Sequence, residues 1–180
     1  EAEAIDYVFC THLHADHCGW NTSFVDGRWV PTFPNAKYVF SKIEYAAAEA
    51  RNDIIFRESA LPIMEAGQAQ LVETDFALDD NVWLQSTPGH TAGHVAVNLA
   101  SNGHSAVMCG DLIHSPIQCV HPEWSPKFDL DKPLAAETRR NFLASNAESG
   151  QLVLTAHVPS PSMGHVVVEG DAFQFKYVDD

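Results

Sequence analysis

Four side chains of metal-binding type lie within six residues near the start of the chain. They are His12, His14, Asp16 and His17, and the residues just before them predict a buried strand. Three imidazoles and a carboxylate in one tight turn are costly unless a partner engages them. Imidazole and carboxylate suit Zn²⁺ and its first-row neighbours. A solvated histidine-rich loop or an expression tag is the alternative, but a tag would be a terminal homopolymer. The chain must therefore fold so that a strand ends at a metal site.

Three more residues of ligand type each close an apolar, strand-like segment. They are His90, Asp111 and His157. Side chains at the ends of adjacent strands converge on one edge of a sheet, so residues far apart in sequence can build one site. Gly89 and Gly110 allow a sharp backbone turn just before two of them. Seven ligands exceed the needs of one tetrahedral zinc and predict two metal ions that share a carboxylate.

Composition narrows the class of protein. The chain has 180 residues, of which 46% are hydrophobic, and this size predicts a single domain over residues 1–180. The net charge of -14 would repel a nucleic-acid backbone, so no nucleic-acid partner is expected. No apolar run reaches the roughly 18 residues that a membrane span needs, so no membrane partner is expected.

Secondary structure is predicted from the periodicity of hydrophobic residues and from residues typical of helix caps and turns. Ser41 begins a helix, with Glu44 completing a capping box. Asn102-Gly103 marks a hairpin turn, and Asp131 caps a helix that runs to about residue 147. Further elements are expected as a helix over 57–66, strands at 68–73, 81–86, 94–100, 105–110, 151–156, 165–168 and 172–178, and a long loop over 115–128. This pattern favours an α/β chain with helices packed outside sheets.

The four cysteines are Cys10, Cys18, Cys109 and Cys119, and none forms a C-x-x-C pair. Cys10 and Cys109 lie in strand-like segments, so buried, reduced thiols are expected. This favours a reducing compartment, the cytoplasm, with a secreted or periplasmic location left open. Cys18 adjoins the histidine cluster and is an alternative soft ligand.

The order and context of these motifs resemble the metallo-β-lactamase superfamily. The resemblance is carried by His12-x-His14-x-Asp16-His17, by His90 in Thr-Pro-Gly-His-Thr, by Asp111 in Gly-Asp and by His157. It implies an αββα sandwich, with His12, His14 and His90 on one metal. Asp16, His17 and His157 would bind the second metal, and Asp111 would bridge the two. Segments such as Gly-Trp-Asn-Thr resemble the branch that holds methyl parathion hydrolase and acyl-homoserine lactonases.

The resemblance also implies an activity. It predicts a dinuclear hydrolase that uses a metal-bridging hydroxide to cleave a small ester, lactone or phosphotriester, with Asp16 and Asp111 as catalytic residues. Zn²⁺ is the expected metal, and Mn²⁺, Fe²⁺ and Co²⁺ are alternatives. A thioester hydrolase like hydroxyacylglutathione hydrolase and an inactive metal-binding fragment are the competing interpretations. Because the cluster begins at residue 12, an N-terminally truncated domain is expected, whose open sheet edge favours a homodimer.

Several neighbouring residues are expected to orient the ligands or to meet the small-molecule substrate. Hydroxyl groups beside the ligands could hold the imidazole rings. These are Thr11, Ser86, Thr91 and Thr155. His94, His114 and His165 are the histidines left near the motifs, and their roles stay open between substrate contact, ligand orientation and surface.

Overall fold

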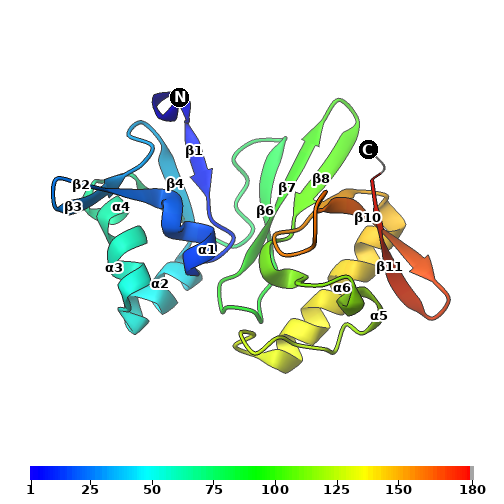
Figure 1. The fold of residues 1–180 in the computed structure, drawn as a ribbon. Helices are drawn as coiled ribbons and strands as arrows, with labels where there is room; N and C mark the ends of the chain where they lie inside the picture. Colours follow the sequence, from blue (N-terminus) through cyan, green and yellow to red (C-terminus); the bar gives the residue numbers. More distant parts are fainter. Residues whose placement is uncertain (179–180) are drawn as a thin grey trace. The chain divides into compact units, whose positions relative to one another are not determined.

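Two units with separate sheets make up the chain: an N-terminal unit, Glu1–Thr74, and a C-terminal unit that begins at Asp75. The structure is a computed structural model that describes residues 1–178. Figure 1 shows strands and helices in both units. The mixed α/β class predicted from the sequence is confirmed.

The N-terminal unit contains a three-stranded parallel sheet in the order β1-β4-β5 and a separate antiparallel pair, β2-β3. Four short helices and two 3₁₀ turns complete the unit. The strands are β1 (Tyr7–Phe9), β2 (Thr22–Val25), β3 (Arg28–Pro31), β4 (Lys37–Ser41) and β5 (Ala69–Val72). The helices are η1 (Ala2–Ala4), α1 (Ala15–Cys18), η2 (Gly19–Asn21), α2 (Lys42–Arg51), α3 (Ile54–Ser59) and α4 (Leu61–Glu65).

Helix starts in this unit follow the capping signals. Ser41 caps α2 as predicted, with its Oγ accepting from the Glu44 N–H at 3.4 Å. The single helix predicted over 57–66 is wrong, because this stretch divides into α3 and α4 at Ala60. Asp53 caps α3 by accepting from the Phe56 N–H at 2.9 Å. Pro62 lacks an N–H and clashes with a continuing helix, so it takes a place in the first turn of a new one.

The C-terminal unit is built on a six-stranded sheet in the order β11-β10-β9-β8-β7-β6. Only the β8-β9 pair is parallel. The strands are β6 (Val82–Ser86), β7 (Val95–Ser101), β8 (His104–Met108), β9 (Leu152–Leu154), β10 (Met163–Glu169) and β11 (Ala172–Tyr177). The helices are η3 (Gly110–Leu112), α5 (Ile117–Val120) and α6 (Lys132–Ser149). Helix α5 falls inside the predicted loop over 115–128, which is therefore only partly irregular.

Helix α6 lies across one face of this sheet and closes the core of the unit (Figure 1). Phe142 and Leu143 of α6 pack with Val107, Val153 and Val166 of the strands, and all five are buried. The predicted N-cap is confirmed, since Asp131 Oδ1 accepts from the N–H of residue 134 at 3.1 Å. The predicted hairpin turn is also confirmed, because residues 102 and 103 both adopt positive φ.

Strand direction places three loop starts at one edge of this sheet. The last residues of β8 and β9 pair in parallel, with Met108 opposite Leu154. Strand β6 ends at Ser86, which pairs with the first residue of β7. Met108 pairs with Val97, also near the start of β7. The segments that follow β6, β8 and β9 therefore leave the sheet at the same edge.

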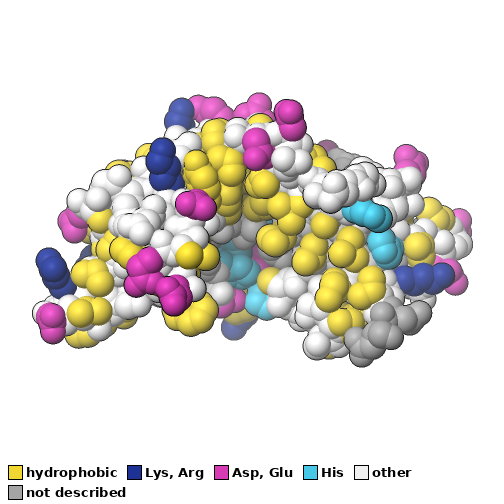
Figure 2. Space-filling model, turned by 90° about the horizontal axis from the view of Figure 1, so that it is seen from above, with side chains coloured by type: hydrophobic (Ala, Val, Ile, Leu, Met, Phe, Trp, Pro, Cys, Tyr) yellow, Lys and Arg dark blue, Asp and Glu magenta, His cyan; other side chains and the backbone are white. Residues whose placement is uncertain are grey.

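The surface carries both apolar and charged side chains. On the face shown in Figure 2, hydrophobic side chains are gathered, while Lys and Arg side chains are dispersed among acidic ones. Among the described residues, no helix is both long and apolar enough to cross a membrane.

Candidate metal-binding site

The histidine cluster folds around a single helical turn. His14 is the N-cap of α1, and its carbonyl accepts from the N–H groups of His17 and Cys18 at 3.0 Å. Residues 14 and 17 are three apart in this turn, so their side chains point to one side. His12 lies in the segment between β1 and the turn. The strand predicted before the cluster is confirmed as β1, but its residues are exposed or half-buried rather than buried as predicted.

The imidazoles of the cluster lie against one another. His12 is fully buried, and its Nε2 lies 3.1 Å from His14 Nδ1. The ring centroids of His12 and His17 are 4.1 Å apart. Thr11 Oγ1 lies 3.1 Å from His12 Nδ1, so this hydroxyl fixes the ring with Nε2 toward His14. The orienting role predicted for Thr11 is therefore supported by its contact. Asp16 is different, because its side chain is 60% exposed and its Oδ2 lies 3.4 Å from His17 Nε2.

Glu44 ties this cluster to helix α2. Its Oε1 accepts from the backbone N–H of Leu13 at 3.0 Å, and both residues are only 2% exposed. The sequence predicts Glu44 as part of a capping box, but its carboxylate reaches into the middle of the histidine motif. Glu44 thus holds the backbone between His12 and His14.

In the C-terminal unit, three imidazoles surround one buried carboxylate. Asp111 Oδ2 lies 3.1 Å from His90 Nε2 and 3.2 Å from His114 Nε2, and Asp111 Oδ1 lies 3.1 Å from His157 Nε2. The predicted convergence of His90, Asp111 and His157 is therefore found within this unit. His114 joins them, with its ring stacked on that of His157 at 4.9 Å. Asp111, His114 and His157 offer ligand atoms within 4.8 Å of one another, as a metal site requires.

The electrostatics of this group favour positive charge. Burial by itself lowers the pKa of His90, but the carboxylates of Asp111 and Asp129 outweigh it and raise that pKa to about 9. Burial raises the pKa of Asp129, and hydrogen bonds from His90 and Arg139 reverse this, so its pKa lies below the ordinary value. Two anionic groups facing opposite nitrogens of one ring make a place that attracts a cation.

His94 positions the central carboxylate from behind. It is fully buried, and its Nε2 accepts the backbone N–H of Asp111 at 3.1 Å. Its Nδ1 lies 2.8 Å from Thr87 Oγ1, so the proton of the neutral ring is assigned to Nδ1. Gly89 and Gly110 have φ of 128° and 52°, which confirms the sharp turns predicted before His90 and Asp111.

Other sequence-based roles for hydroxyl groups find less support. Thr155 Oγ1 donates to the Ser162 carbonyl at 2.9 Å, Ser86 is exposed, and Thr91 Oγ1 has no hydrogen-bond partner among the described residues. Sequence reasoning missed Asp129, whose Oδ1 lies 2.9 Å from His90 Nδ1. Asp129 lies in a stretch without periodicity.

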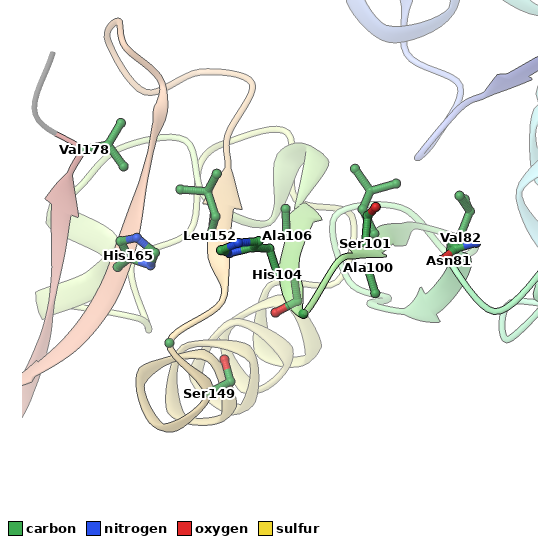
Figure 3. A pocket seen from close by; sticks show the side chains of 14 residues that line it. Asn81, Val82, Ala100, Ser101, His104, Ala106, Ser149, Leu152, His165 and Val178 are labelled. Carbon is green, nitrogen blue, oxygen red and sulfur yellow. The ribbon is translucent and has the colours of Figure 1, made fainter.

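His165 lies elsewhere in the C-terminal unit. It lines a cavity of about 840 Å³ together with His104, Leu152 and Val178 (Figure 3). Its Nδ1 lies 3.2 Å from the Gln151 carbonyl. None of the predicted ligands lines this cavity, so His165 gains no support as a substrate contact at the candidate site.

The cysteines behave as core residues. All four are free and buried, which confirms the prediction made for Cys10 and Cys109. Burial raises the pKa of the Cys18 thiol to about 12, so it stays protonated at neutral pH and is a poor ligand.

Comparisons with known proteins agree with this geometry. The sequence model described as the metallo-beta-lactamase superfamily matches residues 1–123. An N-acyl homoserine lactonase from Bacillus sp is 29% identical over 108 residues, which are 60% of this chain and 38% of that protein. The chain thus spans well under half the length of this relative.

Two solved structures match the fold over 100% of this chain and 66% of their own chains. One is the hydrolase AbOPH of the beta-lactamase superfamily, with 26% identity and a TM-score of 0.88. The other is AidC, a dizinc quorum-quenching lactonase in complex with a product, N-hexanoyl-L-homoserine, with 27% identity and a TM-score of 0.81. The predicted fold class, the mixed α/β fold of the metallo-β-lactamase superfamily, is confirmed.

Proposed function

Since this chain belongs to the metallo-beta-lactamase superfamily, we propose that it is a hydrolase that binds two divalent cations and cleaves a small lactone or ester. Relatives named N-acyl homoserine lactonase support a lactone as the first substrate to test. Phosphotriesters belong to the same proposal, because their hydrolysis makes the same demands on a site: an activated water and stabilisation of a developing anion.

The proposed ligands are the seven residues of the motifs. His12, His14 and His90 would hold one cation, and Asp16, His17 and His157 the other, with Asp111 shared. Zn²⁺ is the proposed metal, and Mn²⁺, Fe²⁺ and Co²⁺ suit the same donors. His114 is a further candidate, because its Nε2 faces the same carboxylate as His90 and His157.

The observation that carries the proposal is the buried Asp111 carboxylate among three imidazoles. All three Nε2 atoms lie 3.1–3.2 Å from its oxygens, and Asp111 is 3% exposed. Nitrogen and carboxylate donors packed this closely fit a divalent cation, which suits both kinds of group. The 3.1 Å approach of His12 Nε2 to His14 Nδ1 fits a cation in the same way. When bound, such cations lower the pKa of a water molecule and stabilise negative charge on an acyl or phosphoryl oxygen.

Residues of the chain itself would then supply orientation and proton handling. Asp111 holds the Nε2 atoms of His90, His114 and His157 toward one place, and His94 holds the Asp111 backbone. Asp16 is exposed, so its carboxylate can accept a proton from water or pass one to a leaving group. The acidic chain favours a substrate without negative charge.

Metal analysis and a substrate panel test the proposal. The purified chain should retain close to two equivalents of metal and hydrolyse at least one of an acyl-homoserine lactone, an aryl ester and a phosphotriester. Asp111→Asn should abolish turnover, while Asp80→Asn, at an exposed position in the same unit, should not change it. Preference for a thioester would favour the thioesterase alternative. Less than one metal per chain together with no turnover would overturn the hydrolase proposal and favour an inactive fragment.

A further inference from the structure

Arg139 is the largest of the fully buried side chains, and it sits beside the proposed ligands rather than among them. It lies on helix α6, whereas the ligands of the C-terminal unit lie in the segments that follow β6, β8 and β9. A guanidinium removed from water is costly unless each donor finds an acceptor. The acceptors that Arg139 contacts therefore indicate the role of this buried charge.

Each end of the guanidinium reaches a different segment. Its Nε donates to the Leu112 carbonyl at 2.7 Å, one residue after the proposed ligand Asp111. Its Nη2 donates to Asp129 Oδ2 at 3.0 Å. Its Nη1 donates to the carbonyls of Pro122 and Trp124 at 2.7 and 3.3 Å. Every nitrogen of the side chain thus has an acceptor, and two of the acceptors adjoin ligand segments.

Asp129, which is bound by Arg139, in turn holds the imidazole of His90. Its side chain is fully buried, and its second oxygen, Oδ1, lies 2.9 Å from His90 Nδ1. The neighbouring backbone is also tied to this loop, since the N–H of residue 130 donates to the His90 carbonyl at 3.1 Å. A carboxylate can only accept, so Asp129 requires a proton on His90 Nδ1 and leaves Nε2, which faces Asp111, as the nitrogen that would bind a metal ion.

We propose that Arg139 and Asp129 are positioning residues that fix both the tautomer of His90 and its distance from Asp111. Arg139 holds Asp129 with one end and the Asp111–Leu112 segment with the other. His90 Nε2 and Asp111 Oδ2, 3.1 Å apart, are thereby held as a preformed pair of donors. This inference rests on the proposed function, because it assumes that the pair binds a metal ion.

The test is the zinc affinity of Asp129→Asn against Asp131→Asn. Asparagine at 129 keeps the size of the side chain but cannot accept from both His90 and Arg139. Zinc affinity should fall about 10- to 100-fold, the usual effect of losing a partner of a metal-bound histidine. Asparagine at the exposed position 131 still caps α6, so zinc affinity there should stay within about twofold of wild type.

Two further measurements keep the proposal falsifiable if Asp129→Asn fails to fold. Arg139→Lys keeps the charge but loses the forked geometry, so it should weaken zinc binding, while Arg140→Lys at an exposed site should not. In the zinc-loaded wild type, long-range ¹H–¹⁵N spectra should show His90 protonated at Nδ1. Equal zinc affinity in folded Asp129→Asn, or protonation of His90 at Nε2, overturns the positioning roles alone. Absence of zinc binding by the wild type overturns the proposed function and this inference together.

Discussion

Glu44 offers the sharpest test of how the histidine motif is held. Its carboxylate is buried and accepts from the N–H of Leu13, between two proposed ligands. Glu44→Leu removes the acceptor and leaves this buried N–H without it. A buried donor that loses a charged acceptor costs about 1.5–3 kcal/mol of unfolding free energy. Glu44→Gln retains an oxygen that can accept, so its cost should stay near 1 kcal/mol, which is about the value of a neutral hydrogen bond.

Glu44→Leu should also weaken zinc binding. If the Leu13 backbone moves, His12 and His14 lose their 3.1 Å approach, and zinc affinity should fall about tenfold, equivalent to about 1.4 kcal/mol. Urea unfolding and zinc titration against a competing chelator measure the two effects on the same samples. Glu49→Leu, at an exposed site on the same helix, is the matched control. Should Glu44→Leu match Glu49→Leu in both stability and zinc affinity, the anchoring role of Glu44 would be refuted.

Gly89→Ala should lower the melting temperature strongly, because its Cβ would lie 2.3 Å from Ala135 N at a φ of 128°. Gly103→Ala has open space, so it should cost only about 1–2 kcal/mol for its positive φ, and equal melting temperatures would contradict this reasoning. Burial raises the pKa of Cys119 from 9.0 to about 11, so its stabilising effect is present below pH 9 and lost toward pH 11. Between pH 8 and 10, the wild type should lose about 1 kcal/mol more unfolding free energy than Cys119→Ala, and an equal loss in the two proteins would contradict this. Removal of metal by a chelator should abolish hydrolysis and Zn²⁺ should restore it, whereas activity that survives complete removal would contradict a metal-dependent reaction.

The convergence of His90, Asp111 and His157 was predictable because it depends on strand ends. Each residue closes an apolar segment, and segments that leave one sheet edge bring their next residues together. The parallel pairing of β8 with β9 does this for Asp111 and His157. Helix caps at Ser41 and Asp131 were predictable for a similar reason, since a cap is a contact between residues close in sequence.

Contacts between distant loops were not predictable in this way. Asp129 lies 39 residues after His90, in a stretch without helical or strand periodicity, and nothing in its neighbours marks it as a partner. The capping box predicted at Ser41 and Glu44 is supported by the bond from the Glu44 N–H to Ser41 Oγ, but no residue near Glu44 in sequence indicates that its carboxylate also reaches Leu13. In both cases the sequence nearby shows which polar group is present, but it does not show which distant residue that group contacts.

One signal for the buried network does exist in the sequence of α6. The residues of this helix that are buried include Ala135, Arg139, Phe142 and Asn146, which follow the i, i+4, i+7, i+11 spacing of one helix face. Arginine on an otherwise core-facing stripe requires an anion or carbonyl groups inside the fold, because an unpaired guanidinium cannot be buried at acceptable cost. The acceptors must come from segments that pack on this face, and these include the loop after Asp111 and the loop that ends at α6. A buried arginine in a helix thus indicates that segments distant in sequence meet at its guanidinium. In this chain, two of those segments contain or contact proposed metal ligands.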